Sequence, residues 1–188
     1  MCADMAPERV ISALLVDPAG IEPRGTLVEF RIATLPFLGE LLTRPTYLGT
    51  KMLWRQAFYN PSSFATDELI EKKLELASLP GAQAAFLKTL RGFVEFRGFR
   101  PGPVAELRSS LQNIDTPCLV VWGANDQRVL ASHAKVLKEV MPNIEVQIWQ
   151  QCGHVPQIEC AERFDRSALA FWCQVDEQVS KQKNARDA

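Results

Sequence analysis

Asp126 and His154 are two residues whose types and positions could support acid–base chemistry, because each follows a segment typical of a β-strand. Cys118 to Trp122 is an unbroken apolar run, the pattern of a parallel strand that is buried on both faces. Residues 144–149 alternate apolar side chains with others, which also predicts a strand. Because open α/β sheets place their chemistry beyond the carboxyl ends of the strands, we expect both side chains in one crevice. A carboxylate that orients an imidazole is the arrangement that a general base needs.

The sequence patterns of the segments that would position this pair predict an α/β fold. Val10 to Asp17 is almost wholly apolar, so we expect a first strand that is covered on both faces. Apolar residues at helical spacing predict a helix at about 134–141, between the other two strands. In the last strand, the positions that alternate with Ile144 and Ile148 are predicted to form a wetter face, which includes Trp149.

The segments around the pair resemble those of the α/β-hydrolase fold family. The matching segments read Thr116-Pro117-Cys118-Leu119-Val120-Val121-Trp122-Gly123-Ala124-Asn125-Asp126 and Gly153-His154-Val155-Pro156-Gln157-Ile158-Glu159. Upstream, Ala6 to Gly20 is similar to the end of the helix behind the family's nucleophile and to the strand after it. The resemblance covers about Met1 to Trp172. It implies a partial α/β-hydrolase fold, with about three parallel core strands, flanking helices and a helical lid insertion.

The same resemblance implies a catalytic triad, of which this chain contains only two members. The family's nucleophilic serine lies in a G-x-S-x-G turn upstream of the other two, and no such motif occurs in the 188 residues. We therefore expect a truncated or incomplete hydrolase, inactive alone, with Asp126 as the acid and His154 as the general base. The expected substrate is a small apolar ester or related carbonyl compound. Because the nucleophile is absent, carbon–carbon, epoxide and carbon–halogen cleavage, which the family also performs, stay open.

Two other ionisable residues need an assignment. Asp17 follows the first strand, where some members of the family place their acid, but an aspartate before Pro-Ala-Gly is typical of a turn. We therefore keep the acid role with Asp126. His133 falls at the start of the helix over 134–141 and is predicted to be a surface or capping residue.

The chain divides by character into a core start at 1–22, a helical cap or lid at 23–103, a carboxyl-terminal core at 104–175 and a polar, frayed tail at 176–188. Thr66 is a predicted N-cap of one lid helix, and no strand pattern interrupts the lid. The lid aromatics could line an apolar substrate site or pack the lid onto the sheet; they are Phe30, Phe37, Trp54, Phe58, Tyr59, Phe64 and Phe86.

Composition excludes several classes of protein. A net charge of −1 predicts no nucleic-acid partner, and the apolar runs are too short to span a membrane. Five cysteines without C-x-x-C predict a reduced, cytoplasmic setting, and the spacing of Cys152, His154 and Cys160 matches no zinc pattern, so neither metal nor cofactor is expected.

Two further possibilities concern partners. The strand residues Ala13 to Val16 would form an exposed sheet edge, which predicts self-association or completion of the sheet by a separate polypeptide. The alternative function is a non-catalytic, hydrolase-like binding or interaction protein that retains an apolar pocket beneath the lid.

Overall fold

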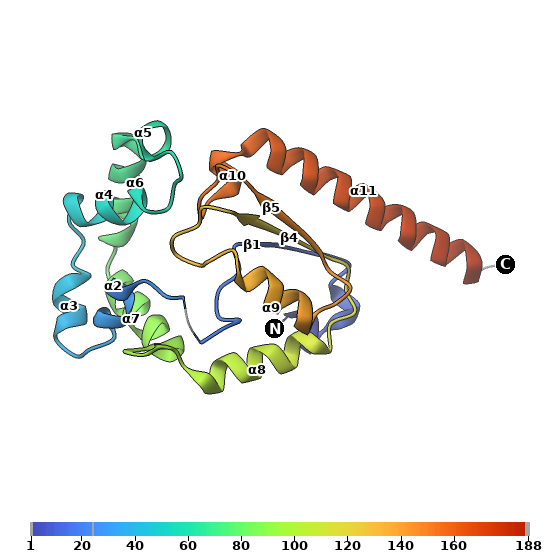
Figure 1. Ribbon diagram of the computed structural model, residues 1–188, viewed down its shortest axis with the longest axis horizontal. Coiled ribbons are helices and arrows are strands. Elements are labelled where there is room, and N and C mark those ends of the chain that lie inside the picture. The colour runs from blue at the N-terminus through green and yellow to red at the C-terminus, as the bar shows by residue number, and fades with distance from the viewer. Residues whose placement is uncertain (1, 24, 187–188) are drawn as a thin grey trace.

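A computed structural model describes residues 2–23 and 25–186, which contain a three-stranded parallel sheet flanked by helices (Figure 1). The strands are β1 (Ala13–Val16), β4 (Cys118–Gly123) and β5 (Glu145–Trp149), in the order β1-β4-β5. In the register, Leu15 lies opposite Val120, which in turn lies opposite Val146. The predicted α/β class and the parallel strands are confirmed.

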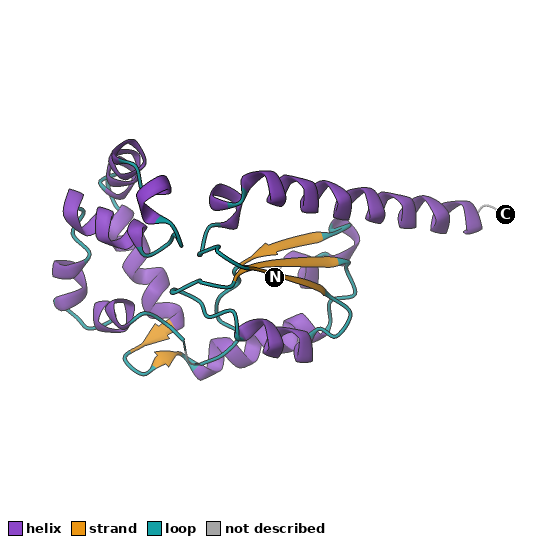
Figure 2. Cartoon of the chain, turned by 45° about the horizontal axis from the view of Figure 1, so that its top comes forward, coloured by secondary structure: helices purple, strands orange, loops and turns teal. Residues whose placement is uncertain are grey.

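The central strand β4 is buried along its whole length. The helices that cover the sheet are α8 (Pro101–Gln112), α9 (His133–Val140), α10 (Pro156–Glu159) and α11 (Ala161–Arg186). Because successive side chains of a strand point to opposite faces, Val120 and Trp122 pack with α8 and α9, whereas Leu119 and Val121 pack against α11. Figure 2 shows the sheet between α8 and α11. This double cover explains why the strand sequence is an unbroken apolar run.

A second group of helices lies beyond one end of the sheet (Figures 1 and 2). Its members are α2 (Val28–Ala33), α3 (Leu38–Leu42), α4 (Tyr47–Arg55), α5 (Pro61–Phe64), α6 (Asp67–Ala77) and α7 (Ala82–Phe93). Before β1 come α1 (Cys2–Met5) and the 3-10 helix η1 (Pro7–Arg9). The predicted cap of α6 is confirmed, because the Thr66 hydroxyl accepts a hydrogen bond of 3.2 Å from the Leu69 N–H.

Residues 23–103, which we call the inserted region, also contain a small hairpin. The prediction that no strand interrupts this region is therefore wrong. The hairpin pairs β2 (Val94–Glu95) with β3 (Gly98–Phe99) in antiparallel register. Gly98 has φ 132°, a conformation that a residue with a side chain rarely adopts, and the ideal position of a Cβ there would meet the Pro23 carbonyl. Two-residue strands are too short to leave an alternating pattern in the sequence.

The two outer strands differ from their predictions in length and burial. β1 begins only at Ala13, its residues are half-buried, and Ile11 is exposed, because β1 has a strand neighbour on one side only among the described residues. In β5, Trp149 is fully buried against α11 while Ile148 is exposed. The face predicted to be wetter is therefore exposed at Glu145 but covered at Trp149. Self-association through β1 stays a prediction.

The segment predicted as a frayed polar tail continues α11 as far as Arg186, and Figure 1 shows this end projecting from the sheet. Val175 anchors its middle, at 3% exposure. Beyond it the helix formers and the spacing of Glu177 and Lys181, one turn apart, favour the helical state. No helix of the described chain combines the length and the apolar character needed to cross a bilayer.

Candidate active site

The structure brings Asp126 and His154 together at the carboxyl ends of β4 and β5. Nδ1 of His154 lies 2.8 Å from Oδ2 of Asp126, a hydrogen-bond distance. The Asp126 side chain is fully buried, whereas the His154 side chain is 25% exposed. An imidazole held through Nδ1 by a buried carboxylate keeps Nε2 available to exchange a proton with a bound molecule.

Asp126 is held rigidly by its own backbone turn. Its Oδ1 accepts hydrogen bonds from the N–H groups of Arg128, at 2.7 Å, and of Val129, at 3.1 Å. This is the turn chemistry in which an aspartate bonds to the backbone two and three residues ahead. The carboxylate therefore has one orientation, with Oδ2 directed to His154.

The loop that carries His154 is attached to the inserted region. The His154 N–H donates to the Ala57 carbonyl at 2.7 Å. Glu159 adds three hydrogen bonds, because its carboxylate accepts from the N–H groups of Tyr59 at 3.1 Å, Asn60 at 2.6 Å and Gly153 at 2.7 Å. One side chain thus joins the segment after α4 to the histidine loop. The sequence contained Glu159 in the quoted motif but did not indicate this role.

Glu159→Gln is expected to destabilise the protein by about 2 kcal/mol, because an amide offers one acceptor oxygen where the three N–H groups use two. For a chain of this size that lowers Tm by roughly 4–8 °C. Thermal unfolding and amide exchange at Gly153 and Asn60 measure the effect. The matched control, Glu139→Gln, changes an exposed residue of α9. Equal Tm values for both variants would contradict the role of Glu159.

Asp17 lies within the same site, which the sequence did not predict. It is 3% exposed. One carboxylate oxygen of Asp17, one of Asp126 and one ring nitrogen of His154 all lie within 4.8 Å of one another. Its Oδ1 accepts a hydrogen bond of 2.9 Å from the Gly123 N–H. Asp17 also has φ 42°, which is uncommon for a residue with a side chain and which aspartate tolerates better than most. The turn predicted at Asp17 therefore directs the carboxyl group of Asp17 into the site.

His154 lines a mainly apolar cavity of about 430 Å³ between the sheet and the inserted region. The aromatic residues that line it are Phe30, Phe86, Phe93 and Phe99. Only Phe30 and Phe86 belong to the predicted set. Phe37 is 88% exposed, whereas Trp54 and Phe64 pack with Phe58 in a separate core. Three of the seven predicted aromatics thus pack within the inserted region, and two line the cavity.

Arg128 brings a positive charge to this apolar cavity. One guanidinium nitrogen, Nη2, donates to the Leu53 carbonyl, and the guanidinium lies 5.6 Å from the centre of the Trp54 ring. Nε is buried without a hydrogen-bond partner, and no described carboxylate lies within ion-pair distance. Burial lowers the pKa of Arg128. Arg128 was not predicted from the sequence, although its position two residues after Asp126 places it beside the site.

His133 is 1% exposed, so its prediction as a surface or capping residue is wrong. Its ring packs edge-on against Trp122, with centroids 6.4 Å apart, and Nε2 lies 3.7 Å from a Glu22 carboxylate oxygen. Burial lowers the pKa of His133, which favours the neutral ring. His133 is a core residue because α9 turns its first helical position towards β4, which periodicity alone did not reveal.

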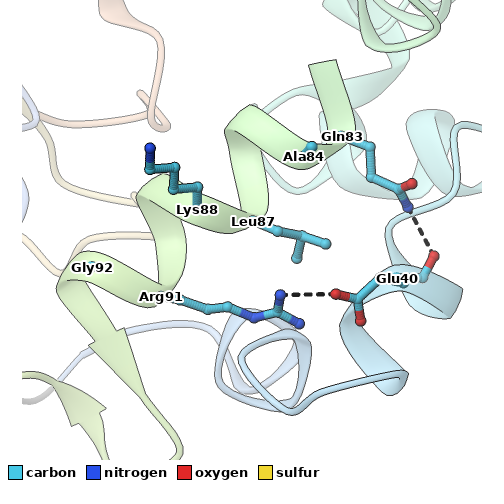
Figure 3. Close-up of a pocket in the computed structure, with 7 residues that line it drawn as sticks. All are labelled: Glu40, Gln83, Ala84, Leu87, Lys88, Arg91 and Gly92. Carbon is cyan, nitrogen blue, oxygen red and sulfur yellow. Dashed lines mark hydrogen bonds and ion pairs between the residues drawn. The ribbon is translucent and has the colours of Figure 1, made fainter. Parts of the chain in front are cut away.

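A second cavity, of about 540 Å³, lies within the inserted region and contains neither Asp126 nor His154 (Figure 3). Three of its polar residues are paired with each other: Arg91 and Glu40 form an ion pair of 2.8 Å, and the Gln83 amide donates to the Glu40 carbonyl at 2.8 Å. These contacts join α3 to α7. The cavity is therefore explained by packing between helices.

The chain is similar to known hydrolases, although no protein-family model matches it. A 2-hydroxy-6-oxononadienedioate/2-hydroxy-6-oxononatrienedioate hydrolase from Burkholderia vietnamiensis is 30% identical over 165 residues, which are 88% of this chain and 54% of that protein. A meta-cleavage product hydrolase from Pseudomonas fluorescens superposes with a TM-score of 0.71 at 22% identity, over 92% of this chain and 59% of its own. The chain has the α/β-hydrolase fold.

A third similar protein has a name of the same kind. A 2-hydroxy-6-oxo-6-phenylhexa-2,4-dienoate hydrolase from a Rhodococcus species gives a TM-score of 0.66 at 20% identity, over 90% of this chain and 58% of its own. The chain spans about half the length of the curated relatives that it matches. The α/β-hydrolase fold of the chain confirms the resemblance seen in its acid and histidine segments.

Proposed function

We propose that the protein is an α/β-hydrolase-type hydrolase of a small carbonyl substrate, with His154 as general base and Asp126 as its acid partner. The observation that carries the proposal is the 2.8 Å contact between His154 and Asp126 beside an apolar cavity of about 430 Å³. The hydrolases named above support the reaction class.

The geometry supports a definite proton path. Asp126 accepts a hydrogen bond from Nδ1–H of His154, so the ring proton stays on Nδ1 and Nε2 of the neutral ring is the basic atom. Nε2 would take the proton of an attacking hydroxyl group, and the resulting imidazolium would be stabilised by the buried Asp126 charge. The same proton would then pass from Nε2 to the leaving group.

The proposal takes the nucleophile to be a serine that these 188 residues do not contain, since they include no G-x-S-x-G motif. The oxyanion hole would likewise come from N–H groups outside them. In this arrangement residues 23–103 act as the lid over the cavity, and their attachment through Glu159 to the histidine loop supports that role.

The substrate proposed is a largely apolar oxo-acid that carries a carboxylate. Two of the hydrolases described above are named for an oxo-dienedioate or an oxo-dienoate, which are carboxylates. Arg128 supports the transfer of this class to the present chain, because its guanidinium lies at an apolar cavity and no described carboxylate is within ion-pair distance of it. A substrate carboxylate would pair with it. Cleavage of a carbon–carbon bond next to the oxo group follows from the same resemblance.

Arg128→Gln is expected to raise KM for a carboxylate substrate roughly 10- to 100-fold, the effect of losing one charge-assisted hydrogen bond. KM for a neutral ester of the same size is expected to change little. Steady-state kinetics on the matched pair of substrates measure both. A similar rise in both KM values would indicate a structural role for Arg128 and would contradict the substrate class.

The function itself is tested by turnover with the complete gene product. An activated aryl ester and a 2-hydroxy-6-oxo-dienedioate are each compared for the natural protein and for His154→Ala. We expect turnover of at least one substrate and its loss in the variant, with circular dichroism showing that the fold is kept. Equal rates for the two proteins would overturn the proposal.

The second candidate is a non-catalytic binding protein that uses the same cavity. The observation that favours it is the apolar lining, which would hold a ligand whether or not a nucleophile is present. Saturable binding of the dienedioate without turnover by the complete gene product would select this candidate.

A further inference from the structure

Asp17 is a buried carboxyl group to which the proposed mechanism gives no role. It is 3% exposed at the carboxyl end of β1, where Oδ1 accepts the hydrogen bond from Gly123. Its Oδ2 is buried without a hydrogen-bond partner among the described residues. A buried carboxyl oxygen without a partner is costly, so its environment should contain something that compensates for it.

The nearest polar groups are those of the acid–base pair. Oxygen atoms of Asp17 and Asp126 lie within 4.8 Å of each other and of a His154 nitrogen. Two carboxylates this close, away from water, do not both carry charge. Asp126 already accepts from the N–H groups of Arg128 and Val129 and from His154. Asp126 is therefore the member that holds the negative charge, and the proton belongs to Asp17.

We propose that Asp17 is a protonated positioning residue, whose Oδ2–H donates a hydrogen bond to the Asp126 carboxylate and leaves one negative charge beside His154. The function of this proton is to hold Asp126 in place and to keep the charge of the pair constant at neutral pH. The role as a positioning residue rests on the proposed function, since it is His154 as base that the pair would orient.

The electrostatics of the cluster agree with this geometry. Burial raises the pKa of Asp17 to about 8, although the hydrogen bond from Gly123 acts to lower it; the charge of Asp126 and a hydrogen bond with it raise the pKa further. The other titratable or charged groups around the cluster are His154, Cys152, Arg128 and His133.

A bound cation is the competing explanation, because two aspartates and a histidine are metal-ligand types. A cation would need the lone pairs through which Asp126 already accepts from His154 at 2.8 Å. A proton on Asp17 satisfies its free oxygen and leaves that contact intact, so the proton is the better fit to the geometry.

The test is a pH titration by NMR of the 188-residue protein, which needs no turnover. The side-chain carboxyl carbon of Asp17 is expected to show the protonated form at pH 6.5 and to titrate near pH 8. The protein has two histidines, and the His154 Cε1 proton is expected to report the same event as a separate step near pH 8. An ionised Asp17 at pH 6.5 would overturn the inference, as would stoichiometric binding of Zn²⁺ or Mn²⁺ that shifts or broadens these signals.

Asp17→Asn provides the matched variant, because an asparagine amide can donate to Asp126 while its oxygen accepts from Gly123. The step near pH 8 at His154 is expected to disappear, whereas the exposed control Asp165→Asn keeps it. Persistence of the step in Asp17→Asn would assign it to another group and contradict the inference. Absence of turnover in the natural protein would count against the proposed function. It would not change the outcome expected for these titrations, so the two hypotheses fail separately.

Stability gives an independent readout with a defined sign. The folded protein holds the Asp17 proton up to about pH 8, whereas an unfolded aspartate loses it near pH 4. The contribution of Asp17 to stability is therefore complete below about pH 4 and is lost as pH rises to 8. Relative to Asp17→Asn, the folding equilibrium constant of the natural protein should fall up to tenfold per pH unit in this window. Parallel pH profiles for the two proteins would contradict the inference.

Discussion

Asp126→Asn is expected to lower kcat by about four orders of magnitude while the protein stays folded. Oδ1 of Asp126 accepts from two backbone N–H groups, so an asparagine must keep its oxygen there and turn its amide towards His154. The amide would donate to Nδ1 at the 2.8 Å contact and force the ring proton onto Nε2. A ring protonated at Nε2 cannot accept the proton of a nucleophile.

The measurement is kcat on the better of the two substrates used for His154→Ala, with the complete gene product. Asp165→Asn, which removes an exposed carboxylate from α11, serves as the control and is expected to keep full activity. A loss of less than tenfold in Asp126→Asn would contradict its role as the acid. Such a result would point to Asp17, the other carboxyl group within 4.8 Å of the cluster.

Gly123→Ala is expected to destabilise the protein by about 3 kcal/mol, the upper part of the usual range for overpacking a core. Gly123 is the last residue of β4, where a Cβ would lie 2.6 Å from the Cys152 carbonyl oxygen and would meet the Gly153 carbonyl as well. These are backbone atoms of the loop that carries His154, so they cannot move aside as a flexible side chain would. Either the strand end or the histidine loop must shift.

Urea and thermal unfolding measure this effect, with a fall in Tm of roughly 6–12 °C expected for a chain of this length. Gly92→Ala is the matched control: Gly92 lies in α7, and a Cβ there meets no atom within 4 Å. That control is expected to be neutral or to stabilise by up to about 1 kcal/mol. Equal stabilities for the two variants would show that the close approach of strand and loop is not tight.

Much of the core could be predicted because its signals are local. The run from Cys118 to Trp122 indicated a doubly covered strand, and β4 is buried along its length. Thr66 indicated a helix start, and it caps α6. The pairing of Asp126 with His154 also followed from sequence, because parallel strands end at one edge of a sheet and both residues come just after a strand.

The remaining parts of the site could not be predicted because they depend on contacts between distant segments. Asp17 appeared to be a turn residue, and only the neighbouring β4 brings its carboxyl beside Asp126. Glu159 joins residues 100 positions apart through backbone N–H groups, which have no sequence signature. Arg128 became a candidate only when the cavity around it was known.

The sequence by itself determined the α/β class, the central strand and the identity of the acid–histidine pair, since these follow from periodicity and from the short spacing between a strand and its loop. The tertiary structure decided which faces are covered. It buries Trp149 under α11 and His133 against Trp122, and it encloses Asp17 beside Asp126. The physical reason is that burial, and with it the charge state of an ionisable group, depends on neighbours supplied by other elements of the fold.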